Sequence, residues 1–127
     1  MTSLTSFFSS NEKGGRSTPE RRADPLPRLL RQLLARANGP CEVVRTASRP
    51  WASALFQGRR HEMILRLSGA DVPARLENMV EGLADAPFAL DGHFVADIIA
   101  DARHIAYAAD GAPMATLELS ALTIEEW

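Results

Sequence analysis

Asp97, Asp101 and His104 are the residues whose types and spacing come closest to a reactive group. On a helix they would lie about one turn apart on one face, where they could bind a metal ion or transfer protons. On a strand, four residues separate the two carboxylates by about 13 Å, which is too far to share a proton or a reacting bond. Any such chemistry therefore depends on the secondary structure of residues 93–107.

Other reactive patterns are missing from the chain. The histidines His61, His93 and His104 show no metal-ligand spacing such as HExxH, and Cys41 is the only cysteine. No GxSxG, P-loop or dinucleotide-binding motif occurs. We expect His61 to be a structural or exposed group at the start of a strand. We predict no catalytic, cofactor-binding or metal-binding residues, no cofactor, and no enzyme activity.

Residues 93–107 fit a helical stripe and an alternating strand almost equally well. Asp-Gly turns bracket the segment at 91–92 and 110–111, and residues 114–123 alternate cleanly between apolar and polar. These neighbours favour a strand, and the helix stays as the alternative. As a strand, the segment would direct these residues toward the core: Phe94, Ala96, Ile98, Ala100 and Ala102.

Two helices and three further strands are predicted before this segment. The first helix starts at Asp24-Pro25, with Asp24 as N-cap, and ends at Asn38-Gly39-Pro40. Strands are expected at 41–48, 51–57 and 60–68, with a tight reversal at Gly58-Arg59. A second helix covers roughly 72–85. Residues of alternating pattern in the third strand share one face: His61, Met63, Leu65 and Leu67.

This order, α-β-β-β-α-β-β, predicts an α+β fold with a mostly antiparallel five-stranded sheet and two helices on one face. The third and fourth strands flank the second helix in a βαβ crossover. At 127 residues the chain has room for one domain, placed at 25–127. Residues 1–24, rich in Ser, Thr, Gly and charge, are predicted to be a disordered basic tail.

No stretch approaches the ~20 apolar residues of a membrane span, and the N-terminus does not have the pattern of a secretory signal. A soluble, cytoplasmic protein without membrane contact is therefore expected.

Residues 1–60 carry eleven Lys/Arg and four acids, whereas residues 61–127 carry three arginines and twelve acids. This split indicates either neutralisation within one chain or contact between the basic part of one copy and the acidic part of another. We do not expect nucleic-acid binding, because a basic tail alone binds without sequence preference.

Four residues of the predicted central hairpin are candidates for protein contacts. Trp51 and Phe56 are its prominent aromatic residues, and Trp is enriched at binding hot spots. Burial against the first helix would explain these two aromatics equally well. Arg59 and Arg60, expected at the hairpin tip, could contact acidic groups of a neighbour.

From about Arg49 onward, the chain carries a series of short motifs. They are Trp51-Ala52-Ser53 before a strand, Gly58 and His61-Glu62 opening the next strand, and a helix. They continue with the run from Asp85 to His93 (DAPFALDGH), a strand, an Asp-Gly turn, and a strand ending in Ala121-Leu122-Thr123. In these features the chain resembles the tail-terminator, or tail-completion, proteins of phages and of the gene transfer agents of alphaproteobacteria.

The resemblance implies a structural assembly protein that forms homo-oligomers, such as a ring of six, and contacts other structural proteins. In a head-to-tail ring, one heterologous interface repeats, and a basic patch can meet an acidic one. The long basic tail and Leu67-Ser68-Gly69, where the family commonly has Trp, depart from the family pattern. The alternative is a stand-alone cytosolic bacterial binding domain.

Overall fold

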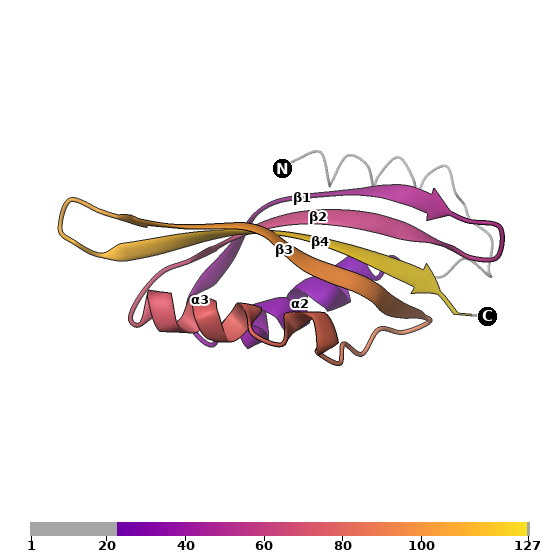
Figure 1. Ribbon diagram of the computed structural model, residues 1–127, viewed down its shortest axis with the longest axis horizontal. Coiled ribbons are helices and arrows are strands. Elements are labelled where there is room, and N and C mark those ends of the chain that lie inside the picture. The colour runs from indigo at the N-terminus through magenta and orange to yellow at the C-terminus, as the bar shows by residue number, and fades with distance from the viewer. Residues whose placement is uncertain (1–22, 127) are drawn as a thin grey trace.

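The computed structural model describes residues 23–126. Both helices lie against the same face of a single sheet (Figure 1), so the α+β class is confirmed. Of the predicted tail, residues 1–22 lie outside the described residues. The elements run in this order: α2 (Leu26–Arg36), β1 (Cys41–Ala52), β2 (Gln57–Leu67), α3 (Val72–Val80), the 3-10 helix η1 (Leu83–Asp85), β3 (His93–Tyr107) and β4 (Pro113–Glu125).

The sheet of the described chain has four strands in the order β1-β2-β4-β3, and every neighbouring pair is antiparallel. β1 and β2 form one hairpin, and β3 and β4 form the other. β2 and β3 therefore run parallel with β4 between them, and α3 lies in the connection. β1 and β3 are the two edges of the sheet.

The prediction of five strands was wrong by one. The segments expected at 41–48 and 51–57 are not two strands, because β1 runs without a break through Arg49 and Pro50 to Ala52. Proline is tolerated there since β1 is an edge strand with only one hydrogen-bonded neighbour. The chain reverses at Ser53–Phe56, where the Ser53 amide donates to the Phe56 carbonyl oxygen at 2.8 Å.

Gly58 and Arg59 lie within β2 and do not form the predicted reversal. Gly58 pairs with Trp51 on one side and with Ile124 on the other. A Cβ atom built on Gly58 would lie 1.9 Å from the backbone oxygen of Thr123. The close approach of β4 therefore requires glycine at this position. In the sequence, an isolated glycine resembles a turn signal, which is why the reversal was predicted here.

β3 is a strand, as predicted, but its side chains do not alternate along its whole length. The register with β4 shifts between Val95 and Asp97 and again between Ala100 and Ala102. Each extra residue reverses the alternation beyond it. Ile98 and Ala100 face the helices as expected, opposite Ala121 and Leu119. Phe94, predicted to be in the core, pairs with Ile124 and is 42% exposed.

The core lies between the sheet and the two helices. The alternation predicted for β2 is confirmed, and the inward residues of β4 and the apolar stripe of α2 complete the layer. The largest fully buried apolar side chains are Leu26, Leu29, Leu33, Met63, Leu65, Leu67, Met79, Leu117 and Leu119.

No helix within residues 23–126 has the length and apolar character needed to cross a membrane.

Both helices are shorter than predicted. α2 starts at Leu26 with Pro25 as its N-cap residue, although the Asp24 carboxylate does accept a hydrogen bond from the Leu26 amide at 3.1 Å. α3 stops at Val80, before the predicted end near 85. Gly82, with a φ of 72°, takes the left-handed conformation that ends the helix and starts the 3-10 turn.

Candidate functional site

The four predicted contact residues do not gather at one hairpin tip. Trp51 lies near the end of β1, half-buried and paired with Gly58. Arg59 and Arg60 lie inside β2, paired with Thr123 and Leu122 of β4. Only Phe56 lies in the β1–β2 turn. The error follows from the misplaced reversal, which moved the tip by about four residues.

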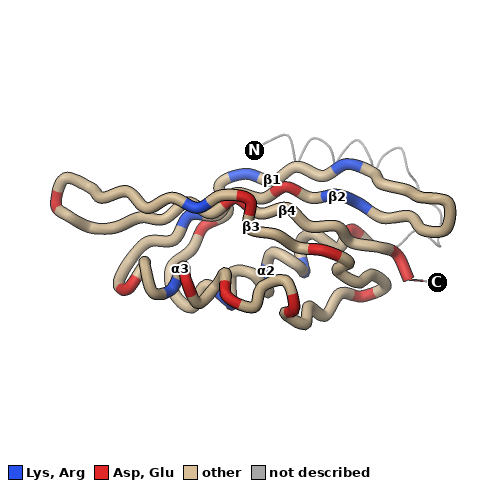
Figure 2. Tube along the Cα trace, viewed as in Figure 1, with Lys and Arg blue, Asp and Glu red and all other residues tan. Residues whose placement is uncertain are grey.

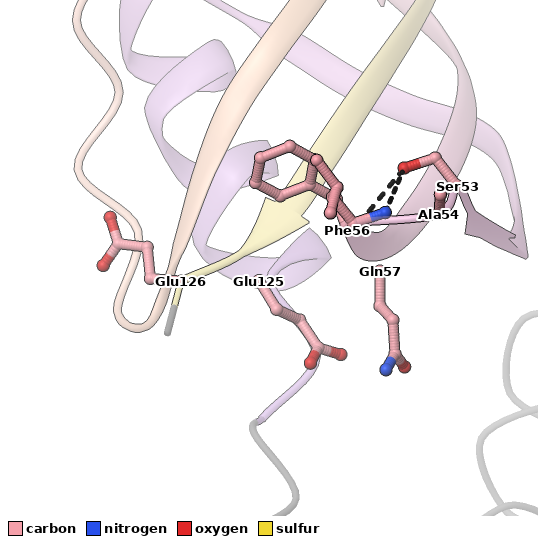
Figure 3. A pocket seen from close by; sticks show the side chains of 7 residues that line it. Ser53, Ala54, Phe56, Gln57, Glu125 and Glu126 are labelled. Carbon is pink, nitrogen blue, oxygen red and sulfur yellow. Dashed lines mark hydrogen bonds between the residues drawn. The ribbon is translucent and has the colours of Figure 1, made fainter.

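The β1–β2 turn carries a small apolar surface. The Ser53 hydroxyl accepts hydrogen bonds from the amides of Leu55 and Phe56, at 3.4 and 3.1 Å. Leu55 is 70% exposed and Phe56 39% exposed. Together with Glu125 and Glu126 the turn lines a pocket of about 270 Å³. In Figure 3 the Phe56 ring points back toward the strands, whereas the two carboxylates point away from it.

His61, predicted to be a structural or exposed group, is fully buried in β2. Its Nδ1 lies 2.7 Å from the Ser48 hydroxyl, and its Nε2 lies 2.9 Å from the Thr123 hydroxyl. Neighbouring strands supply both partners, since β2 lies between β1 and β4. Desolvation by burial, followed by the positive charges of Arg59 and His93, lowers the pKa of His61 to about 4.

The neutral imidazole fits this site with one consistent set of protons. The Thr123 hydroxyl lies 3.5 Å from the Arg59 carbonyl oxygen, to which it donates. Its oxygen can then accept from a protonated His61 Nε2, while Nδ1 accepts from the Ser48 hydroxyl. Both ring nitrogens are engaged and the ring is enclosed. The arrangement holds three strands together and leaves no nitrogen facing an external substrate.

Two further titratable groups lie in this part of the molecule: His93 at the start of β3, and Asp24, which precedes α2. His93 is buried, and its Nδ1 lies 3.3 Å from the Asp91 carbonyl oxygen. Burial raises the pKa of Asp24, and the Leu26 amide and the charge of Arg59 partly oppose that increase. The sequence did not link these residues, because they belong to β2, to β3 and to the segment before α2, which only the tertiary structure brings together.

Asp97, Asp101 and His104 lie along an extended strand. Asp97 pairs with Leu122, Asp101 occupies the second bulge, and His104 pairs with Thr116. Within residues 23–126, no three His, Cys, Asp or Glu side chains are grouped as metal ligands. The helical alternative, which would have gathered these three residues on one face, is therefore wrong.

The face of the sheet opposite the helices, called the outer face below, changes charge from one edge to the other. Arg45 and Arg49 of β1 and Arg60 and Arg66 of β2 alternate with inward-facing residues, so they lie on this face. Across the sheet, β3 contributes acids. In Figure 2 basic positions predominate along β1 and β2, where Glu42 and Glu62 also lie on this face, and acidic positions lie along β3. A shallow concavity of about 590 Å³ crosses the middle of this face.

The β3–β4 hairpin forms an arm that extends beyond the helices (Figure 1). The predicted Asp110-Gly111 turn is confirmed: the Asp110 carboxylate accepts from the Ala112 amide at 3.0 Å, and Gly111 has a φ of 88°. Tyr107 and Met114 of the arm are 65% and 40% exposed. The arm therefore presents apolar side chains and the free edge of β3 to the surroundings.

Comparison of the chain with protein-family models, with curated proteins and with solved structures found no match. The geometry of the described residues is thus the basis for any functional conclusion.

Proposed function

We propose that the protein is a structural assembly protein without enzymatic activity, which acts by self-association and by contacts with other proteins, as the tail terminators that it resembles do. In such a protein the surfaces carry the function. The sheet edges and the arm of this chain would make the contacts, and no group would need to react.

The observation that carries this proposal is the pair of long, open sheet edges. Within the described residues, β1 and β3 span twelve and fifteen residues, and each has only one strand beside it. A typical strand has about 5–6 residues. Between its bulges and away from Pro50, an edge of this length presents unpaired backbone amides and carbonyls that another chain can pair with.

The arm supports the same proposal. An isolated two-stranded ribbon is marginally stable in water, so an arm that projects from a domain gains stability when a partner covers it. Tyr107 is the most exposed of its large hydrophobic side chains, and tyrosine is enriched at protein interfaces.

Light scattering coupled to size-exclusion chromatography of the full chain tests the proposal. The expected mass is a multiple of 13.9 kDa that persists on dilution into the low micromolar range. A mass of one chain at every protein concentration, in both low and high salt, would contradict it. Electron microscopy of the assembled fraction then distinguishes closed rings from filaments.

A second candidate function is a stand-alone binding domain, favoured by the concavity on the outer face. Arg60, Glu62 and Glu118 place both signs of charge around this hollow. A monomer whose melting temperature rises on addition of a small charged ligand would favour this alternative.

A further inference from the structure

The two edges of the sheet run in opposite directions. Each neighbouring pair in the order β1-β2-β4-β3 is antiparallel, so β1 and β3 are themselves antiparallel. When a second copy is placed beside the first in the same orientation, β3 of one copy meets β1 of the next in an antiparallel arrangement. The contact would continue the pattern of hydrogen bonds already present within the sheet.

The charges on these edges favour this contact over the two symmetric ones. Arg45 and Arg49 lie on the outer face of β1, whereas β3 carries Asp97 and Asp101. Pairing β1 with β1, or β3 with β3, would bring like charges together. Pairing β1 with β3 brings opposite charges together and repeats one heterologous interface.

Most of these charges are available for such a contact. Within residues 23–126, the ion pairs involve Arg49 with Glu62 at 3.7 Å, Arg66 with Glu42, and Arg103 with Glu77. Arg45, Asp97 and Asp101 are exposed and have no ion-pair partner in that part of the chain. The Arg49 pair is itself largely exposed to solvent, so it contributes little that a new partner would disrupt.

The spacing along the two edges also matches. Four residues separate Arg45 from Arg49, and four separate Asp97 from Asp101. In an antiparallel pairing that places Arg49 opposite Asp97, Arg45 falls opposite Asp101, which is the extra residue of the second β3 bulge. The regular part of the pairing is therefore 46–49 of β1 with 97–100 of β3. The residues midway between them are then Ala47 and Ile99, both exposed on the outer face, with Ile99 47% exposed. Two opposite-charge pairs would flank one apolar pair.

We propose that the protein assembles head to tail by pairing β3 of one copy with β1 of the next, in the register that sets Arg49 opposite Asp97 and Arg45 opposite Asp101. This inference rests on the proposed self-association and names the surface that performs it. Pro50, which has no amide hydrogen to donate, limits the paired stretch on the β1 side.

Charge reversal of each edge tests the proposal on the full chain. Arg45→Glu/Arg49→Glu places acids on both edges, and Asp97→Arg/Asp101→Arg places arginines on both. Each variant alone is expected to lose assembly, with a dissociation constant raised on the order of 100-fold or more. Mixed in equal amounts, the two variants are expected to assemble, because each then meets an edge of opposite charge. A misfolded variant could not be restored in this way.

The control is Arg28→Glu/Arg31→Glu, which makes the same change in net charge as Arg45→Glu/Arg49→Glu but on the exposed side of α2. It is expected to assemble as the wild type does. If the wild type assembles but the edge variants assemble equally well, or the mixture fails to recover, the edge pairing is overturned while self-association stands. A wild type that is monomeric throughout overturns both.

A cysteine pair tests the register independently. In a Cys41→Ser background, Ala47→Cys combined with Ile99→Cys is expected to form a disulfide between copies under mild oxidation, since directly opposed strand residues lie within disulfide range. Ala47→Cys combined with Phe94→Cys, on the same face but about 17 Å further along β3, is the matched control. Equal cross-linking of the two pairs, or none in an assembled sample, would overturn the register.

Discussion

Burial and strand pairing together determine the state of His61. Ser48 and Thr123 provide a hydrogen-bond partner for each ring nitrogen, while the surroundings exclude water. A charged imidazole would lose its hydration there and face the positive charge of Arg59, so the neutral form is favoured and the pKa falls to about 4. The histidine thus links β1, β2 and β4 by polar contacts.

The stability of the protein should depend on pH through this residue. In the unfolded chain His61 binds a proton near pH 6.5, whereas in the folded chain it does so only near about 4. Its contribution is therefore complete above pH 6.5 and is lost as the pH falls toward 4, on the order of 3 kcal/mol in all. Urea unfolding at pH 5 and pH 8 should show about 2 kcal/mol of this loss, because pH 5 is still above the pKa of the folded state.

His61→Gln is expected to lose most of this pH dependence, whereas the exposed His104→Gln should retain it. Comparison of variants is needed because Asp24, whose pKa is raised, contributes with the opposite sign. The contribution of Asp24 to the stability of the protein falls as the pH rises above 3.8. An unchanged dependence in His61→Gln would show that another group is responsible.

Gly58 is a second position where one residue decides local structure. Gly58→Ala is expected to destabilise the fold by about 3 kcal/mol or more, because the new Cβ would lie 1.9 Å from a backbone oxygen of β4 that cannot rotate away. Gly111→Ala is the control: nothing lies within 4 Å of its Cβ, and its positive φ should cost only about 1–2 kcal/mol. Equal losses, measured by chemical unfolding, would contradict this account.

At the scale of elements, an arginine of each helix donates hydrogen bonds to backbone carbonyl groups at the end of the other helix. Arg36 of α2 donates to the carbonyl oxygens of Met79 and Glu81, at 2.8 and 2.6 Å, which lie at the end of α3. Arg75 of α3 works in the reverse direction and is only 7% exposed. Its guanidinium donates to four carbonyl oxygens at the end of α2 and before α3: those of Ala37, Pro40, Ser68 and Ala70.

Arg75→Met should destabilise the protein by about 3 kcal/mol, since it removes the guanidinium donor from these carbonyl groups while preserving much of the side-chain volume. The Pro40 carbonyl oxygen would keep the Ser68 amide as a donor. Arg31→Met, on the exposed side of α2, should change stability by no more than about 0.5 kcal/mol. Thermal or urea unfolding of the two variants compares them directly. A loss below about 1 kcal/mol for Arg75→Met would mean that water replaces the guanidinium at these carbonyls.

At the scale of the whole molecule, the sheet is longer than the helical layer that covers it. The core ends near Ala115 and Ile105, and the arm beyond them has side chains exposed on both faces. The molecule therefore has one end stabilised by its own core and an arm that its own core does not cover. In the proposed assembly a second copy would stabilise the arm, and the opposite charges of the two edges would select the position of that copy.

Hydrogen exchange should distinguish the assembled chain from the monomeric Arg45→Glu/Arg49→Glu variant. Outward-facing amides of the edge stretches 45–49 and 97–101 should exchange more slowly in the assembled wild type, on the order of tenfold or more, because they gain partners across the interface. The tip at 108–112 should exchange rapidly in both samples. Protection that differs only in the helices would place the interface elsewhere.

Local patterns in the sequence determined the existence and type of most elements. The apolar stripe of Leu26, Leu29 and Leu33 indicated α2, and the alternation from His61 to Leu67 indicated β2. The Asp-Gly turns around residues 93–107 indicated β3 despite its helical periodicity. These features depend on residues within a few positions of one another, which is why they could be read without coordinates.

Only the tertiary structure decided which strands are neighbours, where the reversal lies and what surrounds His61. Gly58 has the sequence character of a turn residue, yet it lies in β2, where the close approach of β4 leaves no room for a side chain. Thr123 reaches His61 across 62 positions of sequence. Such contacts depend on strand order and register, which many distant side chains set together, so no short segment contains them.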